Sequence, residues 1–154
     1  MARGGPKAAT GVVVRRAGAS DAAAINALYR QLVGNPAVQV LPERLIELAD
    51  DPGTLLLVAD IDGEVSGTLL LCLCADVMFA RQPFAVIENV VVDDAWRGRG
   101  VGRALLCHAE AHARDAGCSK LMLLSAQGRS EAHGFFVHQG FDGEAKRGFV
   151  NYRR

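Results

Sequence analysis

Residues 87–102 combine a β-branched run, a short polar turn and a loop rich in glycine and arginine that leads into a helical pattern. Glycine permits positive φ angles and lets the backbone approach a ligand closely. The free N–H groups and the positive dipole end of a new helix attract anions. This stretch therefore predicts a strand, a loop and a helix that together bind a phosphate or pyrophosphate group. The alternative is a glycine-rich connection that only makes a tight turn.

Two common phosphate-binding loops do not fit this stretch. A P-loop has lysine and then serine or threonine after its last glycine, whereas Gly102 is followed by Arg103 and Ala104. A dinucleotide fingerprint reads Gly-x-Gly-x-x-Gly and needs an acidic residue about 20 positions later. Here the spacing is Gly-x-Gly-x-Gly, and the next strand-like run, residues 121–125, ends without a carboxylate. The sequence therefore argues against kinases, ATPases and nicotinamide or flavin enzymes.

The spacing Arg97-x-x-Gly100-x-Gly102 after an apolar strand resembles the acyl-CoA pyrophosphate loop of the GNAT superfamily of N-acetyltransferases. A second motif agrees, because residues 131–141 resemble the later helix of that superfamily, which runs Ala-x-x-Phe-Tyr and ends at Gly-Phe or Gly-Tyr. The close resemblance covers residues 84–142. It implies an α/β fold, with a mixed and mostly antiparallel central sheet flanked by helices, and acetyl-CoA as the co-substrate.

The resemblance also implies which residues bind coenzyme A. Backbone groups of three consecutive valines would pair with the pantetheine arm, as an added strand would, and the loop would hold the pyrophosphate. The later helix would add one aromatic residue. The cofactor-binding candidates are Val90, Val91, Val92, Arg97, Gly98, Arg99, Gly100, Val101, Gly102, Arg103 and Phe136.

Attack of an amine on a thioester requires a deprotonated amine. Glu88 is the candidate general base, because it is the only charged residue between Arg81 and Asp93 and lies in an otherwise apolar strand. Apolar surroundings favour the neutral form of a carboxylic acid, which makes the carboxylate a better base near neutral pH. In the family, an acid at this position often acts through water. The alternative is that Glu88 faces solvent or binds the substrate.

The departing thiolate also needs a proton, and here the later helix departs from the family pattern. Phe136 stands where the family commonly has a tyrosine that acts as general acid. A phenyl ring has no proton to donate, so water, Ser130 or His133 would have to replace it. His133 lies three residues earlier and is the candidate general acid, with a structural or surface role as the alternative.

The leading hypothesis is an N-acetyltransferase that moves the acetyl group of acetyl-CoA directly, in a ternary complex, to a primary amine of a small molecule. A peptide or protein amine stays open as the acceptor. Phe136 supports a second hypothesis from another class, a catalytically weak acyl-CoA-binding or regulatory protein of the same fold. A homodimer is suggested by family habit alone.

Net charge and hydropathy indicate which binding partners and which cellular compartment we expect. The formal net charge is zero, which argues against a general nucleic-acid-binding protein. Between Pro36 and Glu64, seven acidic residues stand against the single Arg44, and such an acidic side would favour a cationic acceptor unless it is only a solvated face. No apolar run approaches the roughly 20 residues that cross a bilayer, and the chain start lacks a signal-peptide pattern, so we expect a cytoplasmic protein. The cysteines predict buried, reduced side chains and no metal site.

The length of 154 residues predicts one acyltransferase domain over residues 12–154, after a disordered arm over residues 1–11. A third strand that is long and apolar should be central, and the apolar run 121–124 should be covered on both faces. Ser20 is expected to be the N-cap of the first helix, with Asp21 as an acid in its first turn. The predicted strands are 12–16, 54–60, 64–78, 87–92 and 121–124, with short closing strands at Phe141 and 147–152. The predicted helices are 20–33, 42–49, 101–116 and 130–139.

Overall fold

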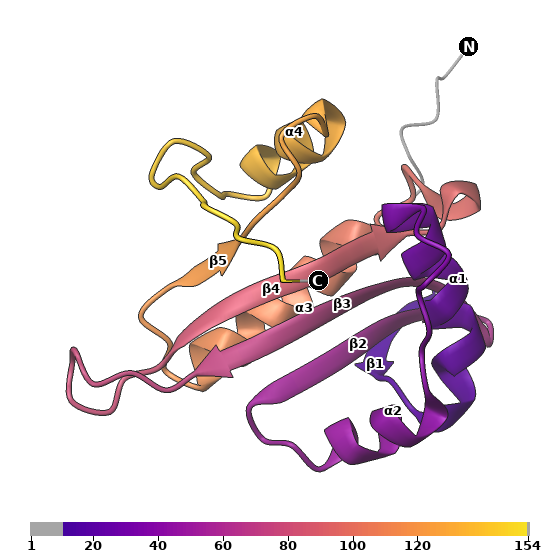
Figure 1. The fold of residues 1–154 in the computed structure, drawn as a ribbon, viewed down its shortest axis with the longest axis horizontal. Coiled ribbons are helices and arrows are strands. Elements are labelled where there is room, and N and C mark those ends of the chain that lie inside the picture. Colours follow the sequence, from indigo (N-terminus) through magenta and orange to yellow (C-terminus); the bar gives the residue numbers. More distant parts are fainter. Residues whose placement is uncertain (1–10, 154) are drawn as a thin grey trace. The chain divides into compact units, whose positions relative to one another are not determined.

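The computed structural model describes residues 11–153, so the predicted N-terminal arm, apart from Gly11, lies outside the described residues. Five strands form one sheet in the order β1-β2-β3-β4-β5 (Figure 1). The strands are β1 (Val12–Arg16), β2 (Thr54–Ile61), β3 (Glu64–Cys74), β4 (Phe84–Val92) and β5 (Leu121–Leu123). The helices are η1 (Ala19–Asp21), α1 (Ala22–Val33), α2 (Pro42–Ala49), η2 (Asp94–Trp96), α3 (Val101–Asp115) and α4 (Ser130–His138).

The chain divides into two compact units, Met1–Met122 and Leu123–Arg154. The first unit contains β1 to β4 with α1, α2 and α3, and the second contains α4 and the C-terminal segment. That residues 12–154 form a single domain stays a prediction. No helix in the described part of the chain is long and apolar enough to cross a membrane.

Strands β1 to β4 pair antiparallel in chain order, which confirms the mostly antiparallel sheet and the central position of β3. The β2–β3 turn has Asp62 at φ 52° and Gly63 at φ 85°. Two successive left-handed residues make the turn whose twist matches a hairpin, as the Asp-Gly pair predicts. The segment that leads into β5 runs in the same direction as β4, because Ser119 N–H donates to Pro83 O (2.8 Å) and Ala85 N–H donates to Lys120 O (2.9 Å).

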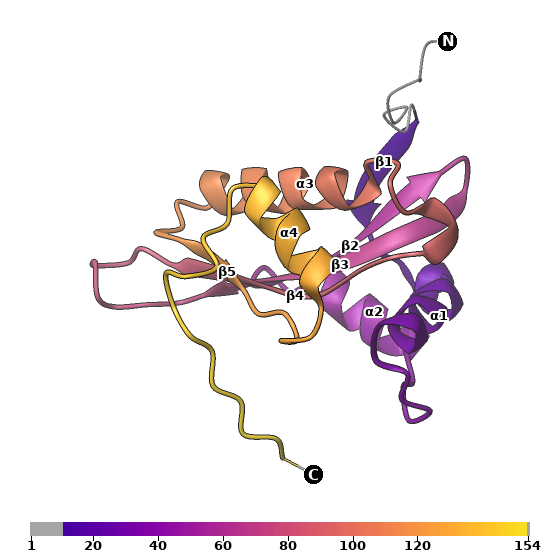
Figure 2. The same ribbon diagram turned by 90° about the horizontal axis from the view of Figure 1, so that it is seen from above.

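The sheet of the first unit is covered on both faces. Helix α3 lies along one face, and α1 and α2 lie along the other (Figure 2). On the α1–α2 face, a buried cluster joins the two helices to β2; its members are Ala17, Ala22, Ile25, Leu45, Leu56 and Val58. Tyr29 of α1 and Leu70 of β3 are partly buried against this cluster. The core therefore fixes α1 over the middle of the sheet.

A charged network ties β1 to η1 and β2. The Arg15 guanidinium donates two hydrogen bonds to the Asp21 carboxylate (2.8 and 2.9 Å) and contacts Asp60 Oδ2 at 3.1 Å. Gly18 N–H also donates to Asp21 (2.8 Å). The Asp21 side chain therefore binds residues that precede it in the chain. The prediction that Ser20 is the N-cap is wrong, because Ser20 lies inside η1 and Asp21 is the N-cap residue of α1. Asp60, counted in the predicted acidic side, is paired with Arg15.

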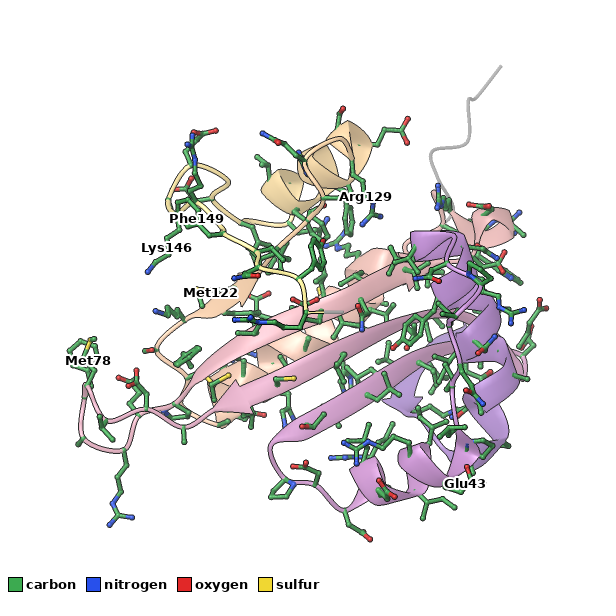
Figure 3. All side chains as sticks on the ribbon, viewed as in Figure 1. Glu43, Met78, Met122, Arg129, Lys146 and Phe149 are labelled. Atoms are coloured by element: carbon green, nitrogen blue, oxygen red, sulfur yellow. The ribbon has the colours of Figure 1, made fainter. Side chains whose placement is uncertain are left out.

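Strand β3 ends at Cys74, so the prediction that it continues to Met78 is wrong. Asp76 Oδ1 accepts hydrogen bonds from Val77 N–H (2.7 Å) and Met78 N–H (3.3 Å). A short acidic side chain that bonds the following backbone competes with strand pairing and starts a turn. Met78 lies at the far end of the resulting loop and is 73% exposed (Figure 3).

Three further predictions about buried or paired segments are wrong. Within residues 11–153, the stretch 147–152 and Phe141 form no strand, and Phe149 is 87% exposed. Strand β5 has only three residues, which are half-buried, and Leu124 after it is exposed. A run of apolar residues does not show which elements pair with it or cover it. The predictions of closing strands and of a strand covered on both faces therefore could not be made from composition alone. All four cysteines are free, and Cys107 is exposed where burial was expected.

The Arg15–Asp21 network predicts a pH-dependent stability. The hydrogen bonds from Arg15 hold the pKa of Asp21 below its ordinary value, so the network stabilises the fold above pH 4 and is lost as pH falls through the lowered pKa. Asp21→Asn should lower the free energy of unfolding by about 2 kcal/mol at pH 7, because Asp21 is buried while Arg15 is partly exposed. Urea unfolding at several pH values measures this difference.

The matched control is Asp62→Asn, which makes the same change in the exposed β2–β3 turn and should alter stability little. The difference between wild type and Asp21→Asn should shrink below about pH 4. A difference that is constant from pH 7 to pH 2 would show that charge pairing at Asp21 is not its source.

Candidate active site

Polar contacts fix the segment that follows β4. Asp93 Oδ1 accepts a hydrogen bond from Ala95 N–H (2.9 Å) and so caps η2. Gln31 of α1 donates to Asp93 Oδ2 (3.2 Å) and accepts from Asp94 N–H (3.3 Å). One amide side chain on α1 therefore holds the start of η2, directly after the end of β4.

The loop enters α3 through two left-handed glycines. Gly98 has φ 73°, and Gly100, the N-cap residue of α3, has φ 83°. The first helical hydrogen bond runs from Ala104 N–H to Gly100 O (3.0 Å). Within α3, the N–H groups of Val101, Gly102 and Arg103 precede that bond and have no helical acceptor, as at any helix start. This is the geometry that favours an anion at the start of α3.

Three arginines surround this helix start, and each has different surroundings. Arg97 forms an exposed ion pair with Asp94 (3.0 Å). The Arg99 guanidinium lies 5.1 Å from the centroid of the Trp96 ring, a cation–π distance. Arg103 is exposed on the first turn of α3. Part of the charge of Arg97 is thus neutralised within the protein, while Trp96 orients Arg99.

The valine candidates contribute backbone rather than side chains. Val91 is 3% exposed and pairs with Thr68 of β3, and Val92 pairs with Gly67. Val101 is 1% exposed, so its side chain belongs to the core and only its backbone is at the loop. Strand β5 has three residues against nine in β4, so it is too short to pair along all of β4. Its length is compatible with an added strand beside Val90, Val91 and Val92.

Strand β4 contains a β-bulge at the predicted base. Leu70 pairs with Glu88 and Thr68 pairs with Val91, so one residue of β3 faces two residues of β4. The extra residue is Asn89, whose φ of 54° lies in the left-handed region that asparagine tolerates better than most residues. Bulges of this kind redirect side chains and are common beside active sites. Here the bulge changes the direction of the strand directly after Glu88.

Glu88 is exposed, so the prediction that apolar surroundings bury its carboxylate is wrong. The reason is the alternation of the strand: Ala85 and Ile87 are buried on one face, and Glu88 lies with the half-buried Val86 on the other. Glu88 lies on the same face as Cys72. Burial first, and then the neighbouring Cys74, Glu88 and Asp51, raise the pKa of the Cys72 thiol. The carboxylates of Glu88 and Asp51 therefore both influence the Cys72 thiol, which lies on the α1–α2 face.

Two residues of α1 that lie against this region, Tyr29 and Gln31, were not predicted from the sequence. Tyr29 of α1 is partly buried, and burial raises the pKa of its hydroxyl. A signal for Asn89 existed, because asparagine is unfavourable inside a β-branched run and marks a bulge. Gln31, in contrast, lies on a helix far from Asp93 in sequence, and nothing in the pattern points to it.

The remaining two candidates lie in the second unit, on α4. His133 Nε2 lies 2.9 Å from Ala126 O, which ties the helix to the loop before it. Phe136 is 8% exposed and packs against Phe135 and Phe141, with ring centroids 5.5 and 6.2 Å away. The structure thus gives both residues packing or hydrogen-bonding contacts within their own unit. Their roles in catalysis and in coenzyme A binding stay predictions.

A mixed sheet with a bulged β4, followed by a glycine-rich loop at a helix N-terminus, defines an acetyltransferase architecture. Residues 24–141 match the model of the Acetyltransferase (GNAT) family. The chain belongs to this family of acetyltransferases, which confirms the predicted family and fold class.

Individual relatives agree with this assignment. The chain is 35% identical over 136 residues to aminoglycoside N(6')-acetyltransferase type 1 of Stenotrophomonas maltophilia, covering 87% of this chain and 88% of the relative. It is 35% identical over 104 residues to an L-amino acid N-acetyltransferase of Escherichia coli K12, covering 62% and 60%. A solved structure described as a putative acetyltransferase from Agrobacterium tumefaciens C58 superposes with a TM-score of 0.83 at 32% identity, covering 92% of this chain and 99% of that one.

Helix α3 lies close to β3 at Gly67. A substitution of Gly67 therefore tests whether the position of α3 depends on this close approach. A Cβ atom at Gly67 would lie 3.0 Å from Val101 Cγ1, 3.2 Å from Leu105 Cδ1 and 3.1 Å from Val91 O. Gly67→Ala should therefore displace the first turns of α3 and lower the free energy of unfolding by about 1–3 kcal/mol. Chemical denaturation measures the loss.

Gly128→Ala is the control, because a Cβ atom there would meet nothing within 4 Å. It should leave the unfolding midpoint nearly unchanged. Equal stabilities of Gly67→Ala and wild type would mean that α3 does not depend on this close approach.

Proposed function

We propose that this acetyltransferase moves the acetyl group of acetyl-CoA to a primary amine of a small molecule, with Glu88 as the general base. One observation carries the proposal: the exposed carboxylate of Glu88, at the β4 bulge, lies ten residues before the left-handed Gly98 in the loop that leads into α3. A base and an anion site on one continuous strand, loop and helix are what acyl transfer from an acyl-CoA requires.

The residues of the loop fit coenzyme A chemically. The pyrophosphate would accept hydrogen bonds from the backbone N–H groups of Gly100, Val101, Gly102 and Arg103 at the positive end of α3. Arg99 and Arg103 add charge, and Arg97 and Gly98 complete the loop. The backbone of Val90, Val91 and Val92 would pair with the amide groups of the pantetheine arm, as strands do. Phe136 would add an apolar contact.

The chemistry on this chain is general-base catalysis by an exposed carboxylate. Glu88 takes a proton from the acceptor ammonium group through water, and the free amine attacks the thioester carbonyl carbon. A C–N bond forms and the C–S bond breaks, so the electron pair leaves on sulfur. The nitrogen then gives up its extra proton, which passes through water to the thiolate, whose conjugate thiol has a pKa of about 8.5 in model compounds. Phe136 has no proton to give, and His133 Nε2 already contacts Ala126 O.

The acceptor class is inferred from charge and from the relatives. Glu88 and Asp51 both act on Cys72, so negative charge gathers on the α1–α2 face, where a cationic amine would be attracted. The relatives named above carry the names of an aminoglycoside N-acetyltransferase and an L-amino acid N-acetyltransferase. Both names refer to small molecules with primary amines. A cationic small-molecule amine is therefore the acceptor that we propose.

Phe136 favours one second function, an acyl-CoA-binding protein with weak catalysis. Loss of the usual acid slows release of the thiolate without affecting the binding of coenzyme A. The two functions differ in turnover, because only the enzyme releases coenzyme A faster in the presence of an amine. Release of coenzyme A at background rates with every amine, despite binding of acetyl-CoA, would favour the second function.

Glu88→Gln should lower kcat/KM by about 100-fold or more, since a positioned base contributes on that order. The assay is release of coenzyme A from pH 6 to pH 9 with an amine panel, which contains aminoglycosides with a free 6′-amine, such as kanamycin, and L-amino acids. Binding of acetyl-CoA, followed by calorimetry, should stay near the wild-type value because Glu88 lies outside the loop.

The matched control is Glu110→Gln, which removes an exposed carboxylate from the third turn of α3. It should retain wild-type turnover and stability. If Glu88→Gln transfers acetyl groups as fast as Glu110→Gln over the whole pH range, Glu88 is not the base.

A further inference from the structure

The three arginines beside the start of α3 are not equivalent. The charge of Arg97 is shared with Asp94, whose carboxylate lies 3.0 Å from the guanidinium. In the part of the chain that the structure describes, no carboxylate lies within ion-pair distance of Arg99 or Arg103. Both side chains are exposed. Two cations near the helix start are therefore not neutralised within the protein.

The guanidinium of Arg99 is held by an aromatic ring. Arg99 lies between the left-handed Gly98 and Gly100, and its guanidinium lies over the Trp96 ring at 5.1 Å from the centroid. Trp96 is half-buried and is the last residue of η2, so its ring is anchored. A guanidinium over an aromatic face keeps the N–H groups of its edge available to donate hydrogen bonds. Because the ring already restricts the side chain, ordering it on a ligand costs less entropy.

Arg103 has a different location. It lies in the first turn of α3, beside the backbone N–H groups of Val101 and Gly102 that have no helical acceptor. These N–H groups and Arg103 together suit the pyrophosphate that we propose for the helix start. The guanidinium of Arg99, in contrast, contacts a residue that precedes the loop. Arg99 is thus a further cation, outside the first turn of the helix.

Coenzyme A carries a third phosphate group besides its pyrophosphate. This group is a monoester on the 3′ oxygen of the ribose, and a phosphate monoester carries about 1.5 to 2 negative charges at pH 7. Dephospho-coenzyme A lacks this group and is otherwise identical. Arginine binds a terminal phosphate well, because its planar N–H groups can donate two parallel hydrogen bonds to it.

We propose that Arg99, oriented by Trp96, binds the 3′-phosphate of coenzyme A and makes the protein select coenzyme A over dephospho-coenzyme A. The inference rests on the proposed coenzyme A site at the start of α3. Arg103 and the helix N–H groups bind the pyrophosphate, which both ligands share. Arg99 therefore determines the specificity for the donor and takes no part in the attack on the thioester.

The test is calorimetry of the full chain with coenzyme A and with dephospho-coenzyme A. The wild-type protein should bind coenzyme A about tenfold or more tightly at low salt, because a hydrogen bond to a charged group contributes on that order. Arg99→Gln should bring the two affinities to within about twofold of each other, with the affinity for dephospho-coenzyme A near the wild-type value. The ratio compares two ligands on one protein, so a partly unfolded variant does not alter it.

Other variants separate the parts of the site. Arg103→Gln should weaken both ligands by a similar factor and keep the wild-type ratio. Trp96→Leu keeps the charge of Arg99 but removes the ring that orients it, so the ratio should fall between the values of wild type and Arg99→Gln. The matched control is Arg114→Gln, which removes an exposed arginine from the last turn of α3. It should leave both affinities unchanged.

The outcomes separate this inference from the proposed function. Equal wild-type affinities for the two ligands would contradict the inference alone, since the pyrophosphate site would still be occupied. Arg99→Gln with the wild-type ratio, or with equal losses for both ligands, would show that Arg99 does not bind the 3′-phosphate. Failure of the wild-type protein to bind either ligand would contradict the proposed coenzyme A site, and the inference with it.

Discussion

The close packing of α3 on β3 determines where the start of α3 lies. Gly67 has no side chain, and Val101 and Leu105 occupy the space that a Cβ atom would need. Because Val101 is the first residue of α3 and Gly67 pairs with Val92, the same contact brings the end of β4 and the N-terminus of α3 together. An anion site made of backbone N–H groups depends on that placement, since its donors cannot move independently of the helix.

The opposite face of the sheet supports the other half of the site. Helix α1 packs there through a buried cluster, lies against β4 and holds the segment after β4 through Gln31. Glu88 is exposed directly before the bulge, on the less buried face of β4. A carboxylate in this position is open to an acceptor from solvent, while the loop that we propose for coenzyme A lies farther along the same chain segment. The two substrates would thus be bound by consecutive parts of one strand, loop and helix.

Sequence patterns correctly predicted those elements whose conformation depends on residues next to one another in the chain. The Asp62-Gly63 hairpin and the start of α3 at Val101 follow from turn residues and glycine, and the structure has them where they were expected. Predictions were wrong where a contact with a residue distant in sequence, or a competing local contact, determines the conformation. The Asp21 side chain is bound by Arg15 of β1, and the apolar neighbours of Glu88 in sequence did not show which face of β4 is open to solvent. Among the site residues, Gln31 and Tyr29 act across tertiary contacts, which no spacing rule could have predicted.

The central claim is that the β4 valines and the loop at the start of α3 bind coenzyme A. The most direct test is a titration of ¹⁵N-labelled protein with coenzyme A, followed by amide chemical shifts. The account predicts the largest changes at Val90 to Val92 and at Gly98 to Arg103, with the other end of α3 little affected. Changes that cluster elsewhere, or no saturable change at the loop, would contradict it.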